Sequence, residues 1–327
     1  MKKIQGMLFM AILLFVVLIP KTVALKMKNP EPGISDFSPE MDKQLILNGV
    51  WYGLNSGPFS LQDLAMSVMI YHFLGEEIPQ KDDVIAYFNS FQNEDGSFGN
   101  THGFGVIPQT FILKAYKILN SKPARSMDSW FDARASDWKT IVEDVKTYSP
   151  TNPWGTLVGY PLSYFVYYSA IPHWMENYFT NVKDNKQTWM TVTHQRDHVT
   201  VPYLVLNRSR PYLEELLITT LNEQQTNGSW FDEISETAMV IHNILLPFYL
   251  RLQTYDLAIT ISAARNFVLS CYHETVLDST PIAGFCNNPT DKTTTFASNF
   301  FGIMAAIDTG LLEGNTDPLY EGWNPSR

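Results

Sequence analysis

The sequence contains little cysteine and little charge, and it lacks the common nucleotide-binding motifs. Only two of its 327 residues are cysteine, and 17% are charged, against 45% that are hydrophobic. It contains no phosphate-binding loop, nucleophile elbow or Rossmann glycine run. The net charge of −10 disfavours nucleic acid and anionic membrane surfaces as partners, because both repel an acidic protein. The composition therefore indicates a globular protein with ample apolar residues for a core.

The N-terminus is typical of a secretory signal peptide. Two lysines precede the apolar run at residues 7–19, Pro20 ends that run, and residues 22–24 offer a cleavage site. The run is shorter than the ~20 residues that a membrane-spanning helix usually needs. We therefore predict a signal peptide at residues 1–24, a secreted or extracytoplasmic protein, and no stable membrane span after cleavage. An uncleaved anchor is the alternative.

Export would place the two cysteines in an oxidising compartment. Cys271 and Cys286 enclose a short loop, so the sequence predicts that they form a disulfide. The run from Cys271 through His273 to Glu274 also combines soft and hard metal ligands, which makes a metal pair the alternative. A second close pair of Cys or His is missing, so we expect neither a metal nor another cofactor.

The rest of the chain alternates apolar helical stretches with turn clusters. A linker rich in proline covers residues 25–44, and no comparable linker interrupts the sequence after it. Alternation of period two is scarce, so the sequence predicts an all-α fold with negligible strand. The predicted helices lie at residues 61–74, 82–91, 109–119, 138–148, 162–170, 212–223, 237–252, 257–269 and 295–307.

Two loops share the pattern Gln-x-x-(Asp/Asn)-Gly-Ser-aromatic. Residues 92–98 read Gln-Asn-Glu-Asp-Gly-Ser-Phe, and residues 224–230 read Gln-Gln-Thr-Asn-Gly-Ser-Trp. The Gly accepts the left-handed conformation that ends a helix, and the Gln can bond the backbone of the neighbouring loop. The helices after the two loops open alike, with Gln109-Thr110 and Glu236-Thr237. Such helical hairpins must stack in an array or a closed ring to bury their apolar faces.

This pattern resembles the repeat of terpenoid cyclases and protein prenyltransferase β-subunits, the prenyltransferase and squalene oxidase repeat. The resemblance implies an α/α toroid of about six helical hairpins over residues 45–312, followed by a tail at residues 313–327. The inner helices of that family enclose an apolar cavity. The resemblance therefore implies an exported protein that binds or transforms a hydrophobic ligand, isoprenoids being the ligands of the family.

The chain departs from the catalytic motifs of the family, so the resemblance leaves enzymatic activity open. The family motif Asp-x-Asp-Asp-Thr-Ala corresponds to residues 233–238 here, and Ser235 replaces the acid that protonates the isoprenoid. The zinc ligands of protein prenyltransferases are not matched. The candidate catalytic residues at the inner-helix starts are Glu236, Glu233, Asp232 and His102. Burial would make Glu236 a general acid, whereas a helix-capping carboxylate is the simpler interpretation.

Two aromatic helices provide the candidate ligand-binding residues, which are Tyr164, Tyr168, Phe296 and Phe300. Aromatic faces can hold hydrophobic molecules, cations or sugars, although a packed helical core contains the same residue types. The alternatives are an exported polysaccharide lyase or glycoside hydrolase of α/α-toroid fold, and a non-catalytic interaction module. The predicted partner is a small hydrophobic molecule or a glycan.

Overall fold

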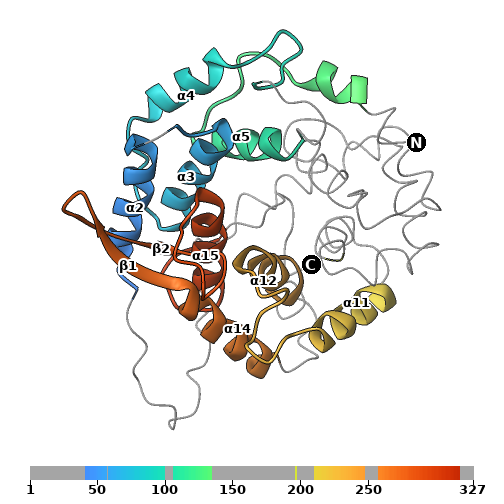
Figure 1. Cartoon of the computed structure of the whole chain (residues 1–327). Coiled ribbons are helices and arrows are strands. Elements are labelled where there is room, and N and C mark those ends of the chain that lie inside the picture. Colours follow the sequence, from blue (N-terminus) through green and yellow to red (C-terminus); the bar gives the residue numbers. More distant parts are fainter. Residues whose placement is uncertain are drawn as a thin grey trace. The chain divides into compact units, whose positions relative to one another are not determined.

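The computed structural model describes residues 41–56, 58–99, 106–134, 196, 210–246 and 257–316 (Figure 1). The chain divides into two compact units, Met1–Phe37 and Ser38–Arg327, and all described residues lie in the second. The predicted signal peptide and the predicted helices at residues 138–148 and 162–170 lie outside the described residues. The described part is mostly helical, as the sequence predicts.

The described helices follow one another as hairpins, in which the first helix is more exposed than the second. In α3, for example, nine of 13 residues are buried, whereas Phe88 is the one buried residue of α4. The first helices are α2 (Lys43–Ser56), α4 (Lys81–Ser90), α11 (Arg210–Asn222) and α14 (Ala258–Cys271). The second helices are α3 (Leu61–Phe73), α5 (Val106–Ile118), α12 (Ile234–Val240) with the π-helix η3 (Ile241–Leu245), and α15 (Phe296–Asp308).

The buried helices pack on one another and form the core. Helix α3 contacts both α5 and α15, and α15 also contacts α12. Phe300 of α15 lies between Phe73, at 5.8 Å between ring centroids, and Phe111, at 5.4 Å. Residues 135–195, 197–209 and 247–256 lie outside the described residues, so the toroid stays a prediction.

Polar caps set the starts of two buried helices close to where the sequence predicts them. The Ser60 hydroxyl accepts the backbone N–H of Asp63, whose carboxylate accepts the N–H of Ser60 in return. Thr295 and Ser298 form the same reciprocal pair at α15. Each pair satisfies backbone donors that a helix start leaves without an intrahelical partner.

The two loops that share the sequence pattern, residues 92–98 and 224–230, adopt the same hydrogen-bonded structure, and we call them the signature loops. The side chains of Asp95 and Asn227 each accept the backbone N–H of the serine two residues later, at 3.0 Å in both loops. Gly96 and Gly228 have φ angles of 88° and 90°, in the left-handed region that favours glycine. A Cβ at either position would also overlap the backbone of the segment packed against the loop. The shared sequence pattern therefore reflects a shared structure.

The glutamine of each loop ties that loop to the segment about one hairpin further along the chain. Gln92 Nε2 donates to the carbonyl oxygen of Arg125 at 2.8 Å, and Gln224 Nε2 donates to that of Thr260 at 2.9 Å. Each Nε2 also donates to the glycine carbonyl of its own loop. The predicted bond from the glutamine to the backbone of a neighbouring loop is found for Gln92, whereas the partner of Gln224 lies in the first turn of α14.

The aromatic residue that ends each loop is anchored by the buried helix that follows. The backbone N–H of Phe98 donates to Gln109 Oε1 at 2.9 Å, and that of Trp230 donates to Thr237 Oγ1 at 3.0 Å. The structure thus matches Gln109 with Thr237, one residue after the Glu236 with which the sequence comparison pairs it.

A β-hairpin between α14 and α15 corrects the prediction of negligible strand. Strands β1 (Tyr272–Leu277) and β2 (Thr280–Phe285) are antiparallel, with Tyr272 opposite Phe285 and Leu277 opposite Thr280. The turn residues Asp278 and Ser279 have φ angles of 47° and 67°, as a two-residue hairpin turn requires. The turn lacks the glycine that is usual in two-residue hairpin turns. The sequence pattern therefore did not predict the hairpin.

Helix α2 is also absent from the helices that the sequence predicts. It contains Gly49 and Gly53, which lower helix propensity. The structure explains both glycines by close packing: a Cβ at Gly49 would lie 2.5 Å from the carbonyl oxygen of Ala283 in β2, and one at Gly53 would lie 2.9 Å from Phe296 Cζ. Helix α2 therefore forms because the hairpin and α15 pack against it (Figure 1).

The predicted disulfide is wrong in this structure, because both cysteines are free, buried thiols. Cys271 ends α14 and Cys286 follows β2. The two residues are therefore opposite each other, next to the paired residues Tyr272 and Phe285. The backbone N–H and the thiol of Cys286 both donate to the carbonyl oxygen of Cys271, each at 3.0 Å. The sulfur of Cys286 is thus directed at a backbone acceptor. Burial raises the pKa of the Cys271 thiol to about 12.

Candidate functional site

The predicted acidic residues lie together at the start of α12, and they line neither of the two cavities described below. Asp232 and Glu233 are exposed, and Asp232 accepts a hydrogen bond from Asn227 Nδ2 at 2.7 Å. Glu233 is the N-cap residue, although its side chain forms no capping bond. Glu236 is half-buried, and its Oε2 is shielded from solvent. His102 lies outside the described residues.

The predicted ligand-binding aromatics separate into different environments. Phe300 belongs to the packed core described above, where it is fully buried. Phe296 is half-buried and lines a cavity between the β-hairpin and α2. Tyr164 and Tyr168 lie outside the described residues. The structure therefore does not bring Phe296 and Phe300 to one described site.

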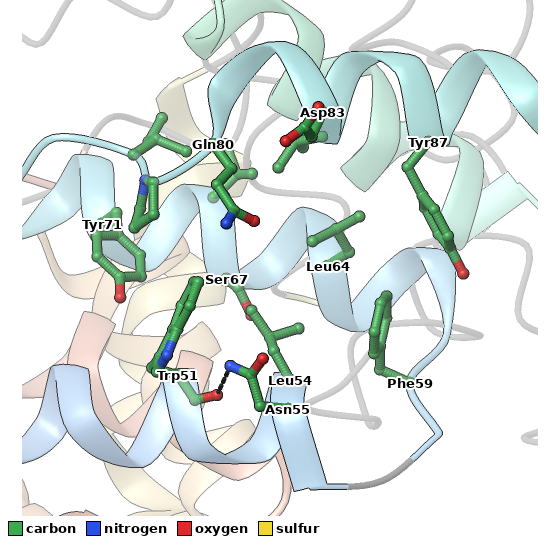
Figure 2. Close-up of a pocket in the computed structure, with 14 residues that line it drawn as sticks. Trp51, Leu54, Asn55, Phe59, Leu64, Ser67, Tyr71, Gln80, Asp83 and Tyr87 are labelled. Atoms are coloured by element: carbon green, nitrogen blue, oxygen red, sulfur yellow. Dashed lines mark hydrogen bonds between the residues drawn. The ribbon is translucent and has the colours of Figure 1, made fainter.

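A cleft between α2, α3 and α4 has a mainly apolar lining, and we call it the aromatic cleft (Figure 2). Its volume is about 210 Å³. Four of its lining residues are aromatic, and most of the others are aliphatic. The lining consists of Trp51, Leu54, Asn55, Phe59, Leu64, Ser67, Val68, Tyr71, Ile78, Pro79, Gln80, Asp83, Val84 and Tyr87.

Helical spacing and one turn position these side chains. Leu64, Val68 and Tyr71 recur at intervals of four and three residues, so they share one face of α3. Gln80 has a φ angle of 51° and is the N-cap of α4, so the chain turns there from the end of α3 into the helix that carries Tyr87. The aromatic cleft is thus bounded by three helices that are close together in the sequence.

Two of the aromatic rings, those of Trp51 and Tyr87, are the exposed ones in the lining of the cleft. Figure 2 shows Trp51 rising from α2 toward α3, and Tyr87 of α4 lying above Phe59. The ring centroids of Phe59 and Tyr87 are 5.6 Å apart. Trp51 and Tyr87 are 40% and 37% exposed, so a molecule in the cleft can contact both rings. Tyr71 lies deeper, and burial raises the pKa of its hydroxyl.

Two polar groups of the aromatic cleft are used by its own helices. Asn55 Nδ2 donates to the carbonyl oxygen of Trp51 at 2.8 Å, and the Ser67 hydroxyl donates to that of Asp63 at 2.8 Å. These donors are therefore not offered to a ligand. Among the lining residues only Asp83 carries a charge, and it is exposed in the first turn of α4. The aromatic cleft is thus lined mainly by apolar side chains and carries one negative charge.

A buried hydrogen-bonded pair between η3 and α15 was not predicted from the sequence. His242 Nδ1 lies 2.8 Å from Asp308 Oδ2, and both side chains are almost fully buried. Thr316 donates its hydroxyl to the same carboxylate. The partners are 66 residues apart, so no local pattern could join them. We interpret the pair as a link between two buried helices, because no cavity described here reaches it.

The described residues show neither a metal site nor a membrane-spanning helix. No cluster of three or more His, Cys, Asp and Glu side chains there is arranged to hold a metal ion, so the metal pair suggested by Cys271 and His273 finds no support. The described helices include none that is both long and apolar enough to span a membrane.

Comparison with known proteins adds no relative. No protein-family model, curated protein or solved structure matches the chain. The resemblance to terpenoid cyclases and protein prenyltransferases therefore stays a prediction from two loops.

Proposed function

We propose that this protein binds a small, apolar, uncharged molecule in the aromatic cleft. The observation that carries the proposal is the pair of exposed rings, Trp51 and Tyr87, at the opening of an otherwise apolar cavity. Aromatic rings bury a large area on contact and lose little conformational freedom, so they dominate the energy of many binding sites. A bound apolar molecule would cover both rings.

The charge of the cleft selects among apolar ligands. Asp83 repels a phosphate or carboxylate placed at the opening, and the net charge of −10 adds to that repulsion. A free isoprenoid or another neutral hydrocarbon therefore fits the aromatic cleft better than a lipid diphosphate does. The lining offers no acid and base pair, which favours binding over chemical transformation. In keeping with the signal peptide that the sequence predicts, we place this activity outside the cytoplasm.

The test uses N-phenyl-1-naphthylamine, a neutral probe whose fluorescence rises in apolar surroundings. We expect the full chain to bind it saturably, and Trp51→Ala to weaken binding about tenfold, which corresponds to roughly 1.4 kcal/mol. Phe231→Ala is the matched control, because Phe231 is 55% exposed and does not line the cleft. Equal loss in both variants, or no saturable binding to the wild-type protein, would contradict the proposal.

A further inference from the structure

The hydroxyl group of Tyr71 has no hydrogen-bond partner among the described residues. Tyr71 lines the aromatic cleft and is only 9% exposed, and a polar group so buried normally has a partner. Its oxygen is not closed off from solvent, so a small molecule can reach it. Burial, and then the charge of Glu76, raise the pKa of this hydroxyl. It therefore stays protonated at neutral pH and can donate a hydrogen bond.

The aromatic cleft runs along α3, from an aromatic end to a polar end. Leu64 and Tyr71 are seven residues apart on α3, which separates them by about 10 Å along the helix axis. Phe59, just before α3, meets Tyr87 at 5.6 Å between ring centroids. Tyr71 lies at the other end of α3, near the turn at Gln80 that begins α4. Figure 2 shows the same order, with Phe59 and Tyr87 on the right and Tyr71 and Gln80 on the left.

Gln80 adds an amide group to the polar end of the cleft. Its side chain forms no capping bond and no other hydrogen bond within the described residues. Figure 2 shows this side chain extending from the start of α4 toward α3. An amide offers both donors and an acceptor, and a phenol hydroxyl does the same. The polar end therefore suits a small neutral group that donates and accepts, as a hydroxyl does.

The charges near the polar end disfavour an ionic group on the ligand. The lining contains no Lys, Arg or His to pair with an anion, and the carboxylate of Glu76 already forms an ion pair with Lys43. Asp83 attracts an ammonium group, but Asp83 is exposed, and ion pairs in contact with water contribute little. An ammonium beside the buried Tyr71 would lose hydration that such a pair does not replace.

We infer that the aromatic cleft selects an apolar alcohol, whose hydroxyl group binds to the Tyr71 hydroxyl while its apolar part packs on Phe59 and Tyr87. This inference rests on the proposed function and deepens it, because it names the class of ligand. A hydrocarbon of the same shape fills the same space but leaves the Tyr71 hydroxyl without a partner. Tyr71 therefore determines specificity, whereas the aromatic rings supply most of the affinity.

The test compares naphthalenes that differ in one substituent, as competitors of N-phenyl-1-naphthylamine for the full chain. 2-Naphthalenemethanol carries a hydroxyl group, and 2-ethylnaphthalene has a methyl group in its place. We expect Tyr71→Phe to weaken binding of 2-naphthalenemethanol about fivefold, because one hydrogen bond between neutral groups is lost. Binding of 2-ethylnaphthalene should stay the same in this variant. Tyr71→Phe removes no hydrogen bond within the described residues, so we expect it to unfold at the same urea concentration as the wild type.

Tyr52→Phe is the matched control. It also removes one tyrosine hydroxyl, which donates to Asp278 Oδ2 at 2.6 Å, but Tyr52 does not line the aromatic cleft. We expect both naphthalenes to bind this variant as they bind the wild type. Two charged relatives, 2-naphthylmethylamine and 2-naphthoate, test the neutrality of the bound group. Both should bind the wild-type protein more weakly than 2-naphthalenemethanol does.

Three results would overturn the inference while N-phenyl-1-naphthylamine still binds, so that the proposed function stands. They are a Tyr71→Phe variant that binds 2-naphthalenemethanol as tightly as the wild type does, equal weakening of both neutral naphthalenes in that variant, and tighter binding of either charged relative than of the alcohol. Absence of saturable N-phenyl-1-naphthylamine binding to the wild-type protein would contradict the proposed function itself, and the inference with it.

Discussion

Helix α2 contributes residues to the aromatic cleft and to the cavity between the β-hairpin and α2, the hairpin cavity, and the lining of the hairpin cavity is the more polar of the two. In the aromatic cleft, Asn55 and Ser67 direct their donors to carbonyl groups of their own helices. In the hairpin cavity, the Nδ1 of His273 finds no such acceptor or donor. The two cavities also differ in the charged side chains that line them: the aromatic cleft has Asp83 alone, whereas the hairpin cavity has Glu274, Asp291 and Lys292. The apolar lining of the cleft is what suits it to an uncharged apolar molecule.

The largest expected effect concerns the thiols beside the hairpin cavity. A pKa of about 12 for Cys271, above its ordinary value, means that the thiol stays protonated at pH 8.5. Its thiolate fraction is then roughly a thousandfold lower than in the unfolded chain. We expect iodoacetamide to alkylate the native protein at least a hundredfold more slowly than the urea-unfolded protein. Detection of fewer than two thiols in unreduced, unfolded protein would instead show a disulfide.

The next effect tests how closely the hairpin packs on α2. Gly49→Ala places a methyl group against the backbone of Ala283, which cannot turn aside, so we expect a loss of about 2 kcal/mol in urea unfolding. Gly53→Ala meets only the tip of the Phe296 ring, which can rotate away. The gain in helix propensity should then leave this variant within about 0.5 kcal/mol of the wild type. Equal stability of the two variants would contradict the packing of α2 on β2.

The smallest effect concerns the charge of the aromatic cleft. Asp83→Asn removes the negative charge at the opening without changing its shape. We expect the affinity for the anionic probe 1-anilinonaphthalene-8-sulfonate to rise about threefold, and the affinity for N-phenyl-1-naphthylamine to stay unchanged. Asp95→Asn is not a suitable control, because Asp95 holds a signature loop. Glu94→Gln is suitable, since Glu94 is exposed and lines neither cavity.

Local signals account for what the sequence predicted well. The pattern at residues 92–98 and 224–230 contains its own reasons, namely a glycine with positive φ, a carboxylate or amide that accepts the serine N–H, and a glutamine that reaches the next segment. The start of α3 was likewise predicted, since Ser60 and Asp63 form a capping box within four residues. These features depend on neighbours in the chain.

Long-range contacts account for what the sequence could not reveal. The hairpin depends on α2, more than 200 residues earlier in the chain, and the His242–Asp308 pair joins distant helices. The aromatic cleft combines Trp51 and Tyr87 from different helices, with no motif to mark them. The family resemblance predicted catalytic roles for Asp232, Glu233 and Glu236. These residues line neither of the two described cavities.

The most direct test of the central claim is to map where a neutral apolar molecule binds. A naphthalene carrying a diazirine can be photolysed in complex with the full chain, and its adducts can be located by peptide mass spectrometry. We predict adducts concentrated at Trp51, Phe59 and Tyr87, and their suppression by excess N-phenyl-1-naphthylamine. Adducts concentrated outside the aromatic cleft, or spread over the chain without competition, would contradict the account.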